Sequence, residues 1–305
     1  MKLYLLLLLF FIVNSHSTAV HAETKKKILV INSDSAVETY RVVQDVFIQA
    51  INQPVIQIDL HDQSLKMSDI EEKLYDIYPD ISYCIGTKAY MISHQYIREK
   101  SIVFSSIINY LRLPMTANRY GISNEIHPEI QITLFHYIFP TIQKIGLLYS
   151  KEYTLQWYEK TVTEAQLLGI KIIGEVISSN DMINRSLNKL IPEIDAYWLI
   201  SDPVIISQKE DILSILKRCD TEKKPVFSYH DIFIKYGATL IISVDHPTIG
   251  RQVAGISEKL LKGQSLEENI QWPAGSDIKK KKKKVKEYGL NINKEALGSV
   301  NKIIE

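Results

Sequence analysis

The sequence predicts an α/β protein with two similar lobes, each built on a doubly wound parallel sheet. Short apolar runs rich in β-branched residues alternate with longer amphipathic stretches along the chain. Strands that are apolar along their whole length are typical of parallel sheets covered by helices on both faces. The order of these elements also occurs twice, which predicts two copies of one unit.

The individual elements follow from hydrophobic periodicity. Apolar runs predict strands at Lys27–Asn32, Val55–Leu60, Ile81–Ile85, Ile102–Phe104, Ile145–Tyr149, Ile170–Ile177, Ala196–Ile200, Val226–Phe227 and Thr239–Val244. The amphipathic stretches between them predict helices at Ala36–Ile51, Ser68–Tyr78, Lys88–Arg98, Pro128–Phe139, Thr154–Leu168, Ser207–Cys219 and Ile249–Leu261.

Three pairs of segments carry the internal repeat. KILVINS resembles KIGLLYS, DISYCIGT resembles DAYWLISD, and KSIVFSS resembles KKPVFSY. The members of each pair begin 117, 115 and 123 residues apart. A nearly constant offset of this size indicates two lobes rather than a short-period solenoid.

Small polar residues end nearly every predicted strand. In open parallel sheets, ligands bind beyond the carboxyl ends of the strands, where helix N-termini also present free N–H groups. Two such edges facing each other predict a polar cleft, although each hydroxyl is equally suited to cap a helix. The residues concerned are Ser33, Thr87, Ser105, Ser150, Ser178, Ser201, Ser228 and Ser243.

The charge of the chain is nearly balanced, but it is unevenly distributed. The 305 residues include 36 Lys and Arg and 35 Asp and Glu, and seven lysines fall within Lys279–Lys286. A nucleic-acid-binding domain needs a basic face, whereas the rest of this chain is mildly acidic, so no nucleic-acid partner is expected. The lysine tract is expected to be a solvated loop, with contact to anionic lipid headgroups as the alternative.

The N-terminus has the pattern of a secretory signal peptide over residues 1–22. A basic residue precedes the apolar run Leu3–Val13, and a small-residue site ends at Ala22. Export with cleavage near Ala22 is expected, and an uncleaved anchor is the alternative. Exported chains can form disulfides, but the repeat puts Cys84 and Cys219 in different lobes, so both are expected as free thiols.

No local motif predicts catalysis. The chain lacks GxSxG, GxxxxGK[ST] and HExxH, and NSDS follows the first predicted strand where GxGxxG would bind a dinucleotide. The six histidines beyond the signal region are scattered without i, i+4 pairing. We therefore expect a protein that is not an enzyme and has no metal or cofactor, with an exported α/β enzyme as the alternative.

Four segments match a known family pattern. They are FPTIQKIGLLY at 139–149, PVF at 225–227 with KYGA at 235–238, Asp245 followed by GRQVA and LLKG at 250–263, and KEYGL at 286–290. Through them the chain, from Lys27 to about Ile292, resembles the ABC-transporter substrate-binding proteins of the tryptophan/tyrosine-type group. That resemblance implies the type I periplasmic-binding fold and a location in the periplasm.

The resemblance also implies two lobes joined by a hinge of three chain crossings, which closes when ligand favours the closed state. The implied parts are a signal peptide at 1–22, lobe one at 25–122 plus 238–264, and lobe two at 123–237 plus 265–305. The implied crossings lie near Tyr120–Asn124, Gly237 and Gln264–Ile270.

The family's ligand-binding positions map onto strand-end loops of both lobes. The chain departs from the family pattern in the loop Ser105–Pro114, where the acidic residue is missing and Asn109 is the nearest polar substitute. This loop is a candidate contact for either the ligand or a protein partner. The implied site residues are Ser33, Asp34, Thr87, Ser105, Ser106, Asn109, Ser150, Tyr153, Asp202, Tyr229 and Asp245.

The chemistry of this set suits a zwitterion. Carboxylates such as Asp202 or Asp245 are able to hold an ammonium, while hydroxyls and helix N-termini hold a carboxylate. Tyr153 and Tyr229 are able to stack on an apolar or aromatic ligand. The alternatives are a helix cap for Asp202, a hinge hydrogen bond for Asp245 and ordinary half-exposed rings for the tyrosines.

Two functions of different class follow from the resemblance. The first is a monomeric solute receptor that binds a small amino-acid-like or other organic molecule and delivers it to a membrane permease. The second is a ligand-sensing module that docks on a membrane signalling protein. Both functions need a signal peptide and a hinge, so the sequence leaves both open.

Overall fold

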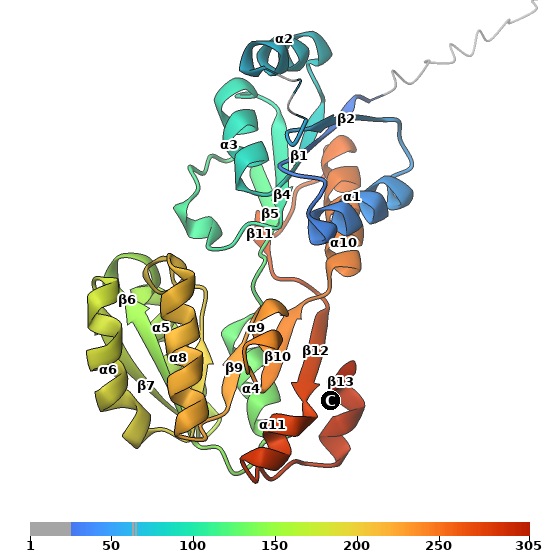
Figure 1. The fold of residues 1–305 in the computed structure, drawn as a ribbon. Helices are drawn as coiled ribbons and strands as arrows, with labels where there is room; N and C mark the ends of the chain where they lie inside the picture. The colour runs from blue at the N-terminus through green and yellow to red at the C-terminus, as the bar shows by residue number, and fades with distance from the viewer. Residues whose placement is uncertain (1–25, 63, 65) are drawn as a thin grey trace, which may run out of the picture.

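Two lobes joined by three linking segments make up the protein (Figure 1). The computed structural model describes residues 26–62, 64 and 66–305, so the predicted signal peptide lies outside the described residues. Lobe one contains a six-stranded sheet and lobe two a seven-stranded sheet. The predicted fold of two parallel-sheet α/β lobes is confirmed.

The sheet of lobe one is entirely parallel and has the order β11-β5-β4-β3-β1-β2. Its central strands are buried on both faces, as their unbroken apolar sequences predict. The strands are β1 (Ile28–Asn32), β2 (Val55–Asp59), β3 (Ile81–Ile85), β4 (Ser101–Ser105), β5 (Arg119–Ile122) and β11 (Ile270–Gln271).

Helices cover both faces of this sheet because alternate residues of each strand point to opposite sides. Ile28 and Val30 of β1 pack in one core with α1 and α10, whereas Leu29 and Ile31 pack in another with α2 and α3. The elements are α1 (Glu38–Ala50), α2 (Met67–Ile77), α3 (Thr87–Tyr96), α10 (His246–Leu261) and the short helix η1 (Tyr110–Arg112).

Helices α1 and α10 approach each other closely at Gly250. A Cβ atom at this position would lie 2.8 Å from the carbonyl oxygen of Val43 and 2.9 Å from the Cβ of Val46. Only glycine fits this crossing without displacing α1, which gives a physical reason for the glycine in the GRQVA segment.

The sheet of lobe two has the order β13-β12-β10-β9-β8-β6-β7 and is parallel except where β10 meets β12. Its strands are β6 (Lys144–Ser150), β7 (Lys171–Ile177), β8 (Ala196–Leu199), β9 (Val226–Ser228), β10 (Leu240–Val244), β12 (Ser276–Lys281) and β13 (Lys302–Ile304). Its helices are α4 (Pro128–Ile138), α5 (Lys151–Leu167), α6 (Ile183–Leu190), α7 (Pro203–Ile206), α8 (Lys209–Thr221), α9 (Ile232–Lys235), α11 (Lys282–Glu287) and the 3-10 turns η2 (Asn180–Met182), η3 (Ile191–Glu193) and η4 (Glu295–Ser299).

The chain passes between the sheets in three places, at residues 123–127, at Asp245 and at residues 272–275. The first and third segments touch, since the rings of His127 and Trp272 are 4.8 Å apart at their centroids. The second is a single residue, which caps α10 by accepting a hydrogen bond from the backbone N–H of Thr248.

The lobe boundaries differ from the implied division at two of these places. Residues 238–244 were expected in lobe one, but β10 pairs in parallel with β9 and continues the sheet of lobe two. The crossing therefore falls at Asp245 instead of Gly237. Residues 270–271 were expected in lobe two, but they form β11, which pairs with β5 of lobe one.

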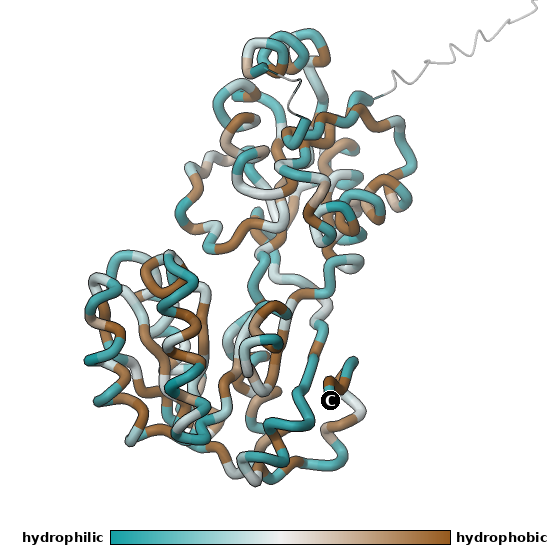
Figure 2. Tube along the Cα trace, in the orientation of Figure 1, coloured by the Kyte–Doolittle hydropathy of each residue, from teal (hydrophilic) through white to brown (hydrophobic). Residues whose placement is uncertain are grey.

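The lysine tract is not the solvated loop that its composition suggests. It forms the second half of β12 and then most of α11, and it is the hydrophilic run beside the C-terminus in Figure 2. Strand β12 pairs with the buried β10, so position in the sheet overrides the weak strand propensity of lysine. Lys280 is buried with only 4% exposed.

Ion pairs hold several of the remaining lysines against lobe two. Lys279 pairs with Asp277 at 2.8 Å and also with Asp231, while Lys284 pairs with Asp220 and with Glu287 at 3.2 Å. The hydrogen bond from Lys284 is the main reason that the pKa of Asp220 is lowered. These lysines serve the packing of lobe two, and their charge is matched within the protein.

Both cysteines are free and buried, in different lobes, as predicted. Burial raises the pKa of each thiol to about 12. They are therefore protonated core residues.

Candidate functional site

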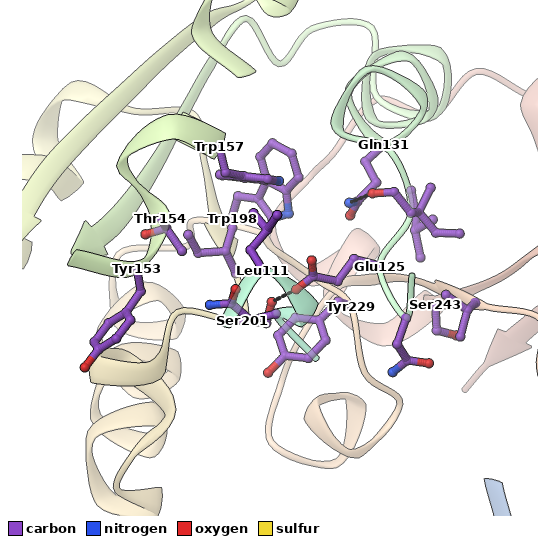
Figure 3. Close-up of a pocket in the computed structure, with 16 residues that line it drawn as sticks. Leu111, Glu125, Gln131, Tyr153, Thr154, Trp157, Trp198, Ser201, Tyr229 and Ser243 are labelled. Carbon is purple, nitrogen blue, oxygen red and sulfur yellow. Dashed lines mark hydrogen bonds between the residues drawn. The ribbon is translucent and has the colours of Figure 1, made fainter. Parts of the chain in front are cut away.

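A pocket lies between the two lobes, where the carboxyl ends of β8, β9 and β10 face a loop of lobe one (Figure 3). Lobe two supplies its floor, the first linking segment supplies one wall, and Asn109 and Leu111 of lobe one form the opposite side. The pocket therefore touches both lobes and the hinge, at the kind of sheet edge where the strand-end argument placed it.

Aromatic side chains form the apolar part of the pocket. Trp157 of α5 packs edge to face on Trp198 of β8, with ring centroids 5.2 Å apart, and Trp198 packs in the same way on Phe135. Trp198 is almost fully buried, so its position is fixed by the core of lobe two. Tyr153 and Tyr229 complete the aromatic lining.

Glu125 contributes a carboxylate from the linking segment. It accepts hydrogen bonds from the hydroxyl of Ser201 in lobe two and from the backbone N–H of Asn109 in lobe one. Figure 3 shows this carboxylate directed at Ser201, beside the ring of Tyr229. Burial raises the pKa of the Glu125 carboxyl because an anion loses hydration there, and the two hydrogen bonds only partly offset this.

Three further polar atoms in the pocket lining have no hydrogen-bond partner among the described residues. The amide of Gln131 donates to the carbonyl oxygen of Ile126 at 2.8 Å, which leaves its Oε1 buried and free. The Oδ1 of Asn124 and the Nδ2 of Asn109 are also buried and unpaired. Leaving such atoms unpaired costs free energy, so they are ready partners for a bound molecule.

A direct contact between the lobes lies at the edge of the pocket. The guanidinium of Arg112 in η1 sits 4.7 Å from the ring centroid of Tyr153 in α5. This cation–π contact joins the loop of lobe one to the first turn of α5.

Three of the eleven implied site residues line this pocket: Asn109, Tyr153 and Tyr229. Asn109 adopts a left-handed backbone with φ of 53°, which turns the chain after β4 into η1. Burial, followed by the nearby charge of Glu125, raises the pKa of Tyr229, so its phenol stays neutral.

Asp202 and Ser150 lie just below the pocket and form a closed network. The carboxylate of Asp202 is fully buried. One of its oxygens accepts three hydrogen bonds, from the backbone N–H of Ser150 at 2.8 Å, from the Ser150 hydroxyl at 2.7 Å and from the Thr154 hydroxyl at 2.5 Å. Its other oxygen caps α7 through the N–H of Val204 at 2.9 Å. The helix-cap alternative for Asp202 matches this geometry.

The other implied residues of lobe one lie at or just beyond the ends of its strands, and they do not line the pocket. Ser105 is buried against the hydroxyl of Tyr83 at 2.7 Å, and Ser106 follows with φ of 60°. Ser33 accepts from the N–H of Ala89 at 3.0 Å, and Thr87 begins α3.

Two implied aspartates are engaged in local contacts outside the pocket. Asp34 accepts a hydrogen bond from the N–H of Ala36 and pairs with His61 at 3.1 Å. Asp245 caps α10 and lies 3.8 Å from the guanidinium of Arg251.

Sequence reasoning missed most of the groups that give the pocket its chemistry, namely Asn124, Glu125, Gln131, Trp157 and Trp198. Ser201 had been noted only as one of eight polar strand ends. The linking segment and the helices α4 and α5 carry no strand-end signal, and Trp198 lies inside strand β8, so nothing in the periodicity singled these residues out.

A second group of ionisable side chains lies beside the hinge. His127, Glu129 and Glu164 each offer one atom that could bind a metal ion, and these three atoms lie within 4.8 Å of one another. The ammonium of Lys160 lies 3.3 Å from His127 and 3.6 Å from Glu164, so a cation already balances the cluster. This arrangement fits an ion-pair network better than a metal site.

Comparisons with known proteins agree with this architecture. Three solved structures are similar: an ABC domain in complex with L-Trp from Streptococcus pneumonia (19% identity, TM-score 0.63), a conserved domain protein from Vibrio cholerae (18%, 0.62) and the ligand-free, open structure of a substrate-binding protein with adhesive properties from Clostridium difficile (16%, 0.69). Each alignment covers 92% of this chain and 99% or more of the other. At these identities the likeness shows the fold.

The family follows from the sequence. No protein of curated function matches the chain. Within the described residues, no helix is long and apolar enough to cross a membrane. The model of the ABC transporter substrate-binding protein family matches residues 43–303. The chain therefore belongs to the ABC transporter substrate-binding protein family.

Proposed function

We propose that this protein is the exported solute receptor of an ABC importer and binds a small amino-acid-like or other organic molecule between its lobes. The observation that carries the proposal is the pocket itself, which combines an aromatic wall with unpaired polar atoms at the junction of both lobes and the hinge. Such a combination is characteristic of small-molecule sites. The proposed role is binding and delivery, without catalysis.

The linking segments supply a mechanism for coupling binding to closure. Glu125 lies on one of them, and its carboxylate already bonds to Asn109 of lobe one and Ser201 of lobe two. A ligand that contacts the same groups has more partners when the lobes approach, so it favours the closed state. The closed form is then the one that a membrane permease would recognise.

The proposed ligand contacts extend the pocket lining. Asn109, Tyr153 and Tyr229 are proposed to touch the ligand in the conformation described here. Ser33, Asp34, Thr87, Ser105 and Ser106 end strands on the facing edge of lobe one, and we propose that closure brings this edge to the ligand. Ser150, Asp202 and Asp245 are proposed as framework residues that hold the pocket floor and the hinge.

A ligand screen tests binding. The mature protein, starting at Glu23, would be heated with amino acids, amines, sugars and small carboxylates, and its Tm measured. A ligand at 100 times its Kd adds about 2.7 kcal/mol to the stability of the folded state, which is several degrees for a protein of this size. If no compound raises the Tm of protein shown to be folded and ligand-free, the receptor proposal fails.

An uptake assay tests the importer role separately. Cells lacking the gene should take up the labelled ligand more slowly, and the wild-type gene should restore uptake. If the protein binds the ligand but uptake is unchanged, the importer role is refuted. A pull-down of membrane signalling proteins would then test the sensing alternative.

A further inference from the structure

We infer that the pocket selects an organic cation, namely a primary amine carried on an aromatic or apolar body, with its ammonium at Glu125. This inference rests on the proposed receptor function and names its substrate class. It follows from three features of the pocket: its charge, its hydrogen-bonding atoms and its aromatic wall.

The pocket is acidic. Among the described residues of the lining, Glu125 carries the one carboxyl group, and no lysine, arginine or histidine joins it. A second carboxylate, that of Asp202, lies below the floor and bonds to Thr154 of the lining. A bound cation would stabilise the ionised form of the buried Glu125 carboxyl, whereas a bound anion would add an uncompensated charge to a buried site.

The free hydrogen-bonding atoms suit an ammonium. An ammonium offers three N–H donors and no acceptor. The lining provides Oε1 of Gln131 and Oδ1 of Asn124 as unpaired acceptors, and Gln131 is 95% buried with its amide fixed by Ile126. Glu125 accepts two hydrogen bonds, while a carboxylate has about four acceptor positions.

The aromatic wall suits a cation on a flat or apolar body. The indole face is the best cation–π partner among the natural side chains, and Trp157 and Trp198 both line the pocket. At the pocket edge, the ring of Tyr153 already holds the guanidinium of Arg112. The same surface packs on the apolar part of a ligand.

A carboxylate on the ligand finds no basic side chain among the described lining residues. Arg112 lies at the pocket edge with its guanidinium against the ring of Tyr153, and the Nδ2 of Asn109 is the one buried donor of the described lining that lacks a partner. An amine should therefore bind more tightly than the matching amino acid, which differs from the amine by an added carboxylate.

Matched ligand series test this selection by isothermal titration calorimetry of the mature protein. The indole series is tryptamine, L-tryptophan, tryptophol and indole-3-acetate, and the phenyl series is phenethylamine, L-phenylalanine, phenylethanol and phenylacetate. In the series whose body fits, we expect the amine to bind tightest, the neutral alcohol at least about tenfold more weakly and the acid not at all.

Two variants connect the selection to Glu125. Glu125→Gln keeps the shape and should weaken amine binding at least about tenfold more than it weakens binding of the alcohol. Glu268→Gln removes the same charge from an exposed position outside the lining and should change neither. Equal losses for the amine and the alcohol in Glu125→Gln would show a structural effect and refute the selection.

The outcomes separate the two proposals. If an amino acid or an acid binds more tightly than its matched amine, the cation inference is overturned and the receptor function stands. The same conclusion follows if only a sugar or another neutral compound binds. If no compound of any class binds to the folded, ligand-free protein, both proposals fail.

Discussion

The network around Asp202 allows a stability prediction that can be worked from its contacts. Asp202→Ala removes the acceptor of four hydrogen bonds, from Ser150 N–H, Ser150 Oγ, Thr154 Oγ1 and Val204 N–H. A helix cap contributes about 1 kcal/mol, and each bond to a charged group about 1.5–3 kcal/mol. Since the three bonds to Oδ2 share one atom and are not additive, we expect a total loss of about 4–6 kcal/mol.

A graded series distinguishes the network from the cap. Asp202→Asn keeps one oxygen where three donors converge and loses mainly the cap, so it should cost about 1–2 kcal/mol. Asp245→Ala removes a cap that is partly exposed and should cost a similar amount, about 1 kcal/mol.

Chemical denaturation measures these losses by far-UV circular dichroism together with tryptophan fluorescence. Fluorescence reports mainly on lobe two because Trp157 and Trp198 both lie there. If Asp202→Ala is no more destabilising than Asp245→Ala, the buried network does not hold the pocket floor, and the reasoning is wrong.

Three further predictions follow from the charge and packing described above. Burial raises the pKa of Glu125 above its ordinary value near 4.5, so between that value and the raised pKa the folded protein holds a proton that the unfolded chain has released. Stability should therefore fall as pH rises from about 4.5 to the raised pKa. In Glu125→Gln the fall should be smaller, as Tm measured against pH would show. Gly250→Ala should destabilise the protein by about 1–3 kcal/mol through contact with Val43, whereas Gly255→Ala, which meets open space on the same helix, should stabilise it by up to about 1 kcal/mol. Because Lys279, Lys282 and Lys284 are ion-paired within the protein, the Lys279–Lys286 tract should give no binding to phosphatidylglycerol vesicles at about 150 mM salt in a sedimentation assay. Binding that Lys283→Glu abolishes would contradict this.

The sequence predicts those strands whose burial is written in their own residues. Val226–Ser228 and Ile81–Ile85 are apolar runs in the interior of a parallel sheet, and the structure places them within a residue of the predicted bounds. Strand β5 reads RYGI and β12 reads SDIKKK, so neither has a run of apolar residues. Both are strands because of their sheet neighbours, which a local pattern does not contain.

The candidate site was predictable to a smaller extent. Strand ends and family resemblance pointed to the interlobe cleft and to Asn109, Tyr153 and Tyr229. Glu125 escaped notice because its environment comes from residues far away in sequence, such as Ser201. A carboxylate in a connecting segment has no signature of its own until the fold surrounds it.

The single-residue crossing at Asp245 has a consequence for the order of folding. Helix α10 completes the face of lobe one that α1 began, and nearly 200 residues, including most of lobe two, separate Ala50 from His246. A nascent chain that has emerged only as far as β10 lacks one of the two helices that cover this face of the lobe one sheet. Non-local closure of this kind slows folding, so the lobe whose strands are made first is completed late. If the chain is exported as proposed above, slow completion would extend the time during which it can still be threaded through a membrane unfolded.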